Sequence, residues 1–109
     1  MKYSFIILSC EKWDYTRKCL SSLAEKTPPS ELIIIDNGSS EKVCKELKQK
    51  EIEFKQNNWK TNFIFNKKNR GCSTARNQGL EASSGEYICF LDNDIEITNK
   101  GWMHKLSNS

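Results

Sequence analysis

The sequence has 109 residues and a formal net charge of +3, and 37% of its residues are hydrophobic and 28% charged. This length suits one domain with a modest core and is too short for two, so we expect residues 1–109 to form a single domain. The apolar residues occur in clusters, which excludes a disordered chain.

No run approaches the roughly 18 consecutive apolar residues of a membrane span, and residues 1–10 lack the basic start and cleavage site of a signal peptide. We therefore expect a cytoplasmic location, either free or at the inner face of the membrane. The five cysteines form no C-x-x-C pair, so neither a zinc site nor a disulfide framework is indicated. We interpret them as reduced thiols.

The first predicted element is a strand over residues 5–8, where FIIL forms a continuous apolar run. A helix follows, with Asp14 as its N-cap and Pro28 and Pro29 as its stop. Its apolar face comprises Cys19, Leu20, Leu23 and Ala24.

The second strand is LIII at residues 32–35, and the second helix lies within residues 39–50. Ser40 is the expected N-cap of that helix. The segment IEF at residues 52–54 is a candidate for a short additional strand.

The third strand is FIF at residues 63–65, and the fourth is YICFL at residues 87–91. Between them we expect a helix that starts at Ser73 as its cap and ends at Gly85 as a left-handed C-cap. All four apolar runs are continuous rather than alternating, which is typical of parallel strands buried on both faces.

Strands and helices thus alternate along the whole chain. This order predicts an α/β fold in which right-handed crossovers form an open, mostly parallel sheet with helices on both faces. Ligands of such sheets bind beyond the carboxyl ends of the strands. The segments that follow the four strands are all polar, namely residues 9–13, 36–40, 66–71 and 92–94. We therefore predict a ligand site at that edge.

Two aspartates, Asp92 and Asp94, follow the fourth strand with no adjacent lysine or arginine. In an extended segment both side chains would point to the same side. Two carboxylates about 4 Å apart repel by about 1 kcal/mol in water and about 4 kcal/mol at a protein surface. A divalent cation fits this arrangement, because Mg²⁺ needs only one or two protein carboxylates when phosphates supply other ligands. A solvated turn is the structural alternative.

A calcium loop of the EF-hand type is excluded for this segment. Counted from Asp92, the sixth position is Ile97 where the loop needs glycine, and the twelfth is Met103 where it needs glutamate.

Asp36 ends the second strand, where an acid can accept hydrogen bonds from a base or a ribose. Gly38 in the following turn would let a ligand approach the backbone; an ordinary strand-to-helix turn is the alternative. The chain has neither the G-x-G-x-x-G fingerprint after the first strand nor a phosphate-binding loop. This argues against a simple Rossmann dehydrogenase and against a P-loop enzyme.

Arg70, Arg76 and Asn77 surround the start of the third helix. Arginine forks and a helix N-terminus suit phosphate oxygens, although these residues could instead bridge the helix to its preceding loop. The basic run over residues 60–70 is best explained as a solvated face, which leaves nucleic-acid binding a minor alternative. We expect His104, the only histidine, to be a surface residue.

Four ordered segments together resemble a known family. They are SFIILSCEKWDYTRKCLSSL, ELIIIDNGSS, NRGCSTARNQGLEASSGEYICFLDNDIEI and GWMHKL. This set resembles the N-terminal, nucleotide-binding half of family 2 glycosyltransferases, which implies the Rossmann-like half of a GT-A fold. The resemblance covers nearly the whole chain.

The resemblance implies roles at the matching positions. Ser9 would lie against the nucleotide, and Asp36 would contact its base or ribose. Asp94 would bind Mg²⁺ or Mn²⁺, and Asp92 would contact the ribose, the metal or its water. The segment that holds the nucleotide would be residues 70–77 together with Gly79, and its other implied members are Arg70, Gly71, Ala75, Arg76 and Asn77.

The implied activity is metal-dependent transfer of a sugar, with inversion, from a nucleotide-diphosphate donor to an acceptor hydroxyl. The donor would carry UDP, GDP or dTDP, and the acceptor would be a saccharide, lipid or protein, as in polysaccharide biosynthesis. No nucleic-acid partner is implied. A homodimer is left open, because a half-domain exposes apolar surface.

The chain departs from the family pattern in two places. Cys10 and Glu11 stand where many relatives have tyrosine and asparagine. No residue up to Ser109 can be assigned as the catalytic base, so we expect a truncated, donor-binding fragment that is inactive alone. The alternative is a non-catalytic α/β nucleotide-binding or interaction module.

Overall fold

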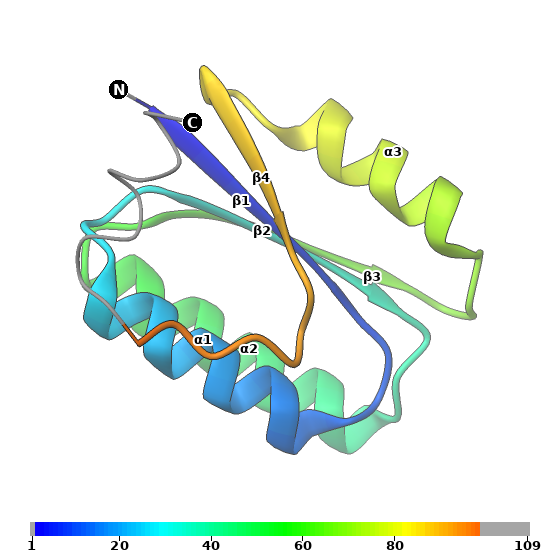
Figure 1. Cartoon of the computed structure of the whole chain (residues 1–109). Coiled ribbons are helices and arrows are strands. Elements are labelled where there is room, and N and C mark those ends of the chain that lie inside the picture. Colours follow the sequence, from blue (N-terminus) through cyan, green and yellow to red (C-terminus); the bar gives the residue numbers. More distant parts are fainter. Residues whose placement is uncertain (1, 99–109) are drawn as a thin grey trace.

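The computed structural model describes residues 2–98 (Figure 1). Its strands are β1 (Tyr3–Ser9), β2 (Glu31–Asn37), β3 (Lys60–Asn66) and β4 (Tyr87–Leu91), and its helices are α1 (Trp13–Lys26), α2 (Glu41–Gln56) and α3 (Cys72–Ala82). The four predicted strands and three main helices are thus confirmed. His104 and the GWMHKL segment lie outside the described residues. No helix among residues 2–98 is long and apolar enough to cross a membrane.

The four strands form one parallel sheet in the order β3-β2-β1-β4. Helices α1 and α2 lie side by side against one face, and α3 covers the other (Figure 1). The predicted open parallel sheet with helices on both faces is therefore confirmed. Because every strand runs the same way, all carboxyl ends meet at one edge.

The core consists of two apolar layers, one on each face of the sheet. Phe5, Ile7, Leu32 and Ile34 pack with α1 and α2, while Ile6, Ile33 and Ile35 pack with Ala75 of α3. The expectation of strands buried on both faces holds for β1 and β2. It is wrong for the edge strands β3 and β4. On β4, Ile88 is 43% exposed and Phe90 is 36% exposed.

Two predictions about the first two helices are wrong. Asp14 lies within the first turn of α1, and the N-cap is Lys12. Residues 52–54 are helical, because α2 continues to Gln56 and buries Phe54 on the same side as Leu47, seven residues earlier. Ser40 does cap α2, since its side chain accepts a hydrogen bond from the backbone N–H of Val43 at 3.4 Å.

The predicted ends of the third helix are also wrong. Its N-cap is Gly71 rather than Ser73, and its C-cap is Ser83 rather than Gly85. The glycine at position 85 is explained by a close approach to β1 and not by a helix cap. A Cβ atom placed on Gly85 would lie 2.5 Å from Oγ and 2.8 Å from N of Ser4, so the chain can pass β1 this closely only without a side chain.

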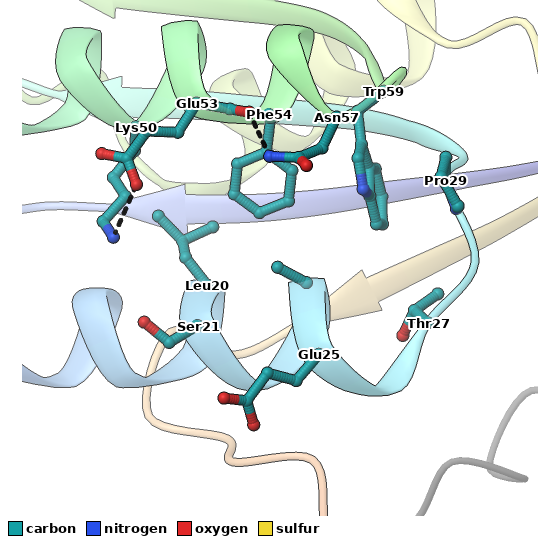
Figure 2. Close-up of a pocket in the computed structure, with 11 residues that line it drawn as sticks. Leu20, Ser21, Glu25, Thr27, Pro29, Lys50, Glu53, Phe54, Asn57 and Trp59 are labelled. Carbon is teal, nitrogen blue, oxygen red and sulfur yellow. Dashed lines mark hydrogen bonds and ion pairs between the residues drawn. The ribbon is translucent and has the colours of Figure 1, made fainter.

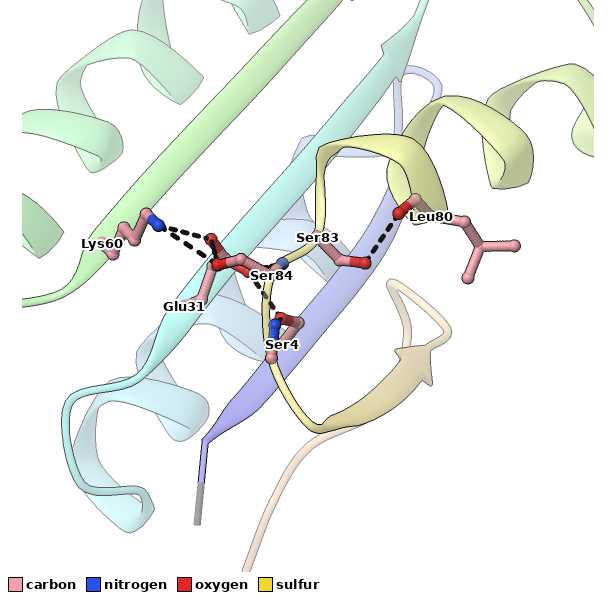
Figure 3. A network of polar contacts seen from close by, with 7 residues as sticks. Ser4, Glu31, Lys60, Leu80, Ser83 and Ser84 are labelled. Carbon is pink, nitrogen blue, oxygen red and sulfur yellow. Dashed lines mark hydrogen bonds and ion pairs between the residues drawn. The ribbon is translucent and has the colours of Figure 1, made fainter.

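A buried carboxylate joins the strands at the edge where they begin (Figure 3). Glu31 accepts hydrogen bonds from Ser4 Oγ at 2.5 Å, from the Ser84 backbone N–H at 2.8 Å and from Ser84 Oγ at 3.0 Å. Lys60 Nζ lies 3.5 Å from its Oε2. Burial alone would raise the pKa of Glu31, but these hydrogen bonds and the charge of Lys60 outweigh it and lower that pKa below its usual value.

We predict that Glu31→Gln lowers the free energy of unfolding by about 2 kcal/mol near neutral pH, because the charged hydrogen bonds are lost. The folded pKa of Glu31 is depressed, so its contribution is present above the ordinary value of about 4.3 and is lost as pH falls through the folded pKa. Urea unfolding of the parent and the variant should therefore show a smaller difference at acid pH.

Glu53→Gln is the matched control, since Glu53 forms a 3.5 Å ion pair with Lys50 on the surface of α2. It should change stability by no more than about 0.5 kcal/mol at either pH. Equal losses for the two variants would contradict a special role of Glu31.

Candidate functional site

The polar segments that follow the strands gather at one edge of the sheet, as predicted. Ser9 and Asp36 are neighbours there, because they are paired in the register of β1 and β2. Both belong to the face that carries Ile7 and Ile34, which is covered by α1 and α2. Both side chains are buried, Ser9 at 1% exposure and Asp36 at 0%.

Asp36 binds its own loop in this structure. Its Oδ2 accepts a hydrogen bond from the Ser39 backbone N–H at 2.9 Å, and its Oδ1 accepts one from Ser39 Oγ at 2.5 Å. Cys44 Sγ lies 3.7 Å from Oδ2. Burial, followed by the charge and hydrogen bond of Asp36, raises the pKa of the Cys44 thiol, which therefore stays protonated. Asp36 thus shapes the turn into α2.

Ser9 has an unused hydroxyl group. Its Oγ is the one buried side-chain nitrogen or oxygen among residues 2–98 that has no hydrogen-bond partner. A buried polar group without a partner costs roughly 1–3 kcal/mol, so such groups call for an explanation. Its position at the carboxyl end of β1, beside Asp36, is where a ligand of this fold class would bind.

Asn37 is a site residue that the sequence reasoning missed. Its Oδ1 accepts hydrogen bonds from Asn66 Nδ2 at 3.1 Å and from the Arg70 backbone N–H at 3.0 Å, and its Nδ2 donates to the Gly71 carbonyl at 3.3 Å. The Asn66 amide in turn exchanges hydrogen bonds of 2.9 Å and 3.0 Å with Gln78. Asn37 therefore holds the start of α3. The signal for Asn37 in the sequence was a polar residue at the end of the apolar second strand.

Gly38 and Gly71 both have φ near +86°. A Cβ atom on Gly38 would lie 2.9 Å from the backbone of Lys68 and Asn69. The chain's own loop is therefore one neighbour that requires a glycine at position 38.

The segment with Asp92 and Asp94 forms a turn. The Ile95 backbone N–H donates to the Asp92 carbonyl at 3.1 Å, so the expectation of an extended segment is wrong. The turn is attached to α1, because Asn93 Nδ2 donates to Thr16 Oγ1 at 3.2 Å. This anchor bends the chain directly after β4.

Both aspartates are exposed, and neither forms an ion pair with a lysine or arginine within the part of the chain that the structure describes. Burial and the nearby charge of Asp94 raise the pKa of the Cys19 thiol to about 11. No group of three or more potential metal ligands occurs among residues 2–98. Two free carboxylates fit an ion such as Mg²⁺, which takes its remaining ligands from water and phosphate.

The helix α3 presents Arg76 and Asn77 as exposed side chains. The Arg76 guanidinium lies 5.0 Å above the ring of Phe90 on β4, so it lies on the face of the sheet that carries Ile88 and Phe90. Arg70, also exposed, is placed through its backbone contact with Asn37.

Ala75 and Gly79 of α3 face the sheet and are buried. A Cβ atom on Gly79 would lie 2.6 Å from Ile6 Cγ2, so this glycine lets the helix lie close to β1. These two residues therefore position the helix and do not line its exposed side.

The sequence matches the family model described as Glycosyl transferase family 2 over residues 4–108. The chain belongs to this family. An uncharacterized glycosyltransferase of Rickettsia bellii is 37% identical over 100 residues, which cover 85% of this chain and 13% of the relative. The poly-beta-1,6-N-acetyl-D-glucosamine synthase of Staphylococcus epidermidis is 34% identical over 95 residues, which cover 86% of this chain and 22% of the relative.

Solved structures show the same fold. TarS of S. aureus superposes with a TM-score of 0.81 at 23% identity, over 99% of this chain and 32% of that one. The mannosyltransferase PcManGT of Pyrobaculum calidifontis, in complex with GDP-Man and Mn²⁺, gives 0.83 at 15% identity, over 94% and 30%. These likenesses establish the GT-A type of fold. In every case the chain spans about a third or less of the related protein.

A groove of about 460 Å³ lies between α1 and α2 (Figure 2), with Trp59 and Phe54 on one side and Leu20 on the other. None of the site residues predicted for this glycosyltransferase family lines it. Its residues belong to the C-terminal halves of α1 and α2 and the segments after them, which lie away from the carboxyl ends of the strands.

We predict that Asn37→Ala lowers the free energy of unfolding by about 2 kcal/mol, because it leaves the Arg70 N–H and the Asn66 amide without their partner. It should also speed hydrogen exchange at the Arg70 amide. Asn62→Ala, on the exposed side of β3, is the control and should change stability by no more than about 0.5 kcal/mol. Unchanged protection of Arg70 in Asn37→Ala would show that another contact holds this loop.

Proposed function

We propose that this chain is the donor-binding part of an inverting, metal-dependent glycosyltransferase. The observation that carries this proposal is the pair Asp92 and Asp94, exposed and without a basic partner among the described residues, at the same edge of the sheet as the unpaired hydroxyl of Ser9. Unbalanced negative charge at this edge suits a donor that arrives with a divalent cation.

Asp94 would hold Mg²⁺ or Mn²⁺, and Asp92 would contact the ribose, the metal or its water. When bound, such an ion neutralises the diphosphate and stabilises the charge that develops on the leaving nucleotide. The turn that Asn93 attaches to α1 would keep both carboxylates at the donor. Their exposure leaves both side chains in contact with water until the donor binds.

The nucleotide would lie over the ends of β1 and β2. Ser9 Oγ would gain there the hydrogen-bond partner that it lacks. Asp36 would accept a hydrogen bond from the base or ribose through lone pairs that Ser39 leaves free, after a small opening of its turn, since the side chain is fully buried. Arg70, Arg76 and Asn77 would provide positive and polar groups toward the phosphates.

The donor class is supported by the related structures. PcManGT was solved with GDP-Man and Mn²⁺, and TarS was also solved with UDP. We accordingly propose a donor that carries UDP, GDP or dTDP. The polysaccharide synthase among the relatives supports a saccharide acceptor. Lipids and proteins are the other acceptors that we propose.

None of residues 1–109 is proposed as the catalytic base. We propose that it belongs to a region of these larger enzymes that the chain does not cover, since the chain spans 13% to 32% of the relatives described above. Without a base to take the proton of the acceptor hydroxyl, direct displacement is slow. The 109-residue chain alone would therefore bind a donor without transferring its sugar.

Calorimetry with UDP, GDP and dTDP, each with and without Mn²⁺, tests this proposal. We predict that Asp94→Ala abolishes the Mn²⁺-dependent part of binding, because one of two available carboxylates is removed. Lys67→Ala, an exposed change in the basic loop, should alter affinity less than about threefold.

Tight binding by Asp94→Ala would refute the metal role of that aspartate. Absence of nucleotide binding by the parent chain would instead favour a module without a donor site.

A further inference from the structure

The loop between β1 and α1 has a backbone conformation that its residues disfavour. Glu11 has φ of 53° and Lys12 has φ of 47°, both in the left-handed region. Residues with a Cβ atom are uncommon there, and two in succession persist only when neighbouring contacts enforce them. This loop directly follows Ser9, so its shape determines what surrounds the unpaired hydroxyl.

The contacts that enforce this conformation come from Glu11. Its Oε1 accepts a hydrogen bond from the Ser40 backbone N–H at 2.7 Å, and its Oε2 accepts one from Ser40 Oγ at 3.2 Å. The backbone N–H of Glu11 donates to Ser39 Oγ at 2.7 Å. Glu11 is thus attached by both its side chain and its backbone to the two residues that precede α2.

These contacts continue to the buried acid of the site. Ser39 Oγ accepts from Glu11 N–H and donates its own hydrogen to Asp36 Oδ1, which forms a chain of hydrogen bonds from the first loop to the end of β2. The Glu11 carboxylate also lies at the N-terminus of α2, where negative charge is favourable. A single side chain therefore couples the two loops that flank Ser9 and Asp36.

We propose that Glu11 is a positioning residue of the donor site. Its carboxylate clamps residues 10–12 onto the start of α2 and so shapes the loop around the Ser9 and Asp36 groups that meet the nucleotide. This inference rests on the proposed donor binding. The clamp gives a reason for a carboxylate at position 11. The two hydrogen bonds from Ser40 use both carboxylate oxygens of Glu11, whereas the side-chain amide of asparagine or glutamine has only one acceptor oxygen.

Four variants of the 109-residue chain separate the clamp from general effects. Glu11→Ala removes the carboxylate and keeps the backbone strain. Glu11→Gly removes the carboxylate and relieves the strain, because glycine adopts a positive φ freely. Glu11→Gln keeps one acceptor for the Ser40 N–H. Glu41→Ala is the control, since it removes a carboxylate from the first turn of α2 without touching the loop.

The first measurement is the affinity for UDP, GDP and dTDP with Mn²⁺. We expect Glu11→Ala to weaken binding of the preferred nucleotide by about tenfold, Glu11→Gly by less, and Glu11→Gln by about twofold. Glu41→Ala should bind as the parent does. Thermal unfolding followed by circular dichroism verifies that each variant is folded at the temperature of the titration.

The second measurement is hydrogen exchange at the Glu11 and Ser40 amides without nucleotide. Both amides donate hydrogen bonds in this clamp, so Glu11→Ala should speed their exchange and Glu41→Ala should not. Faster exchange with unchanged nucleotide affinity would overturn the positioning role. Unchanged exchange would overturn the clamp itself.

Failure of the proposed function gives a different result. If the parent binds none of the three nucleotides, donor binding and the positioning role that depends on it are both refuted. The exchange rates would then decide only whether Glu11 holds the loop.

Discussion

The carboxyl end of β2 is the point on which the rest of the site depends. Asp36 and Asn37 are consecutive, so their side chains point to opposite faces of the sheet. Asp36 holds the turn into α2, and through Ser39 the loop after β1. Asn37 holds the loop before α3. Two adjacent residues of a central strand thereby hold three of the four segments around the proposed donor site.

The fourth segment, which is the turn after β4, is held without the use of its two carboxylates. The turn with Asp92 and Asp94 is attached through Asn93 to Thr16, so neither carboxylate is needed to hold it in place. Since structure is maintained by the neutral residue between them, both acids remain free for a cation. Asp36, by contrast, uses both carboxylate oxygens within its own loop. The acidic residues at the ends of β2 and β4, on either side of β1, therefore differ in whether their carboxylates already have hydrogen-bond partners.

The sequence predicted the alternating fold well because its signal is local. Continuous apolar runs located the four strands, and the polar segments behind them located the site. It failed where the answer depends on distant residues. Asn37 reaches Arg70 and Gly71, more than thirty positions away, and Gly38 is required by Lys68 and Asn69. The C-terminal ends of α2 and α3 were misplaced because their polar caps were not recognised: Asn57 Nδ2 donates to the Glu53 carbonyl at 2.8 Å, and Ser83 Oγ donates to the Leu80 carbonyl at 2.7 Å.

The two edges of the sheet differ in how completely their polar groups are paired. At the edge where the strands begin, Glu31 is buried and saturated by Ser4, Ser84 and Lys60, so a ligand would have to displace contacts that stabilise the fold. At the opposite edge, the Ser9 hydroxyl has no partner and the two aspartates have no counter-charge among residues 2–98. A ligand there can bind the Ser9 hydroxyl and the two aspartates without breaking a side-chain hydrogen bond or ion pair of these groups among residues 2–98. This asymmetry supports the proposed binding at the carboxyl edge with an argument that does not depend on the family to which the chain belongs.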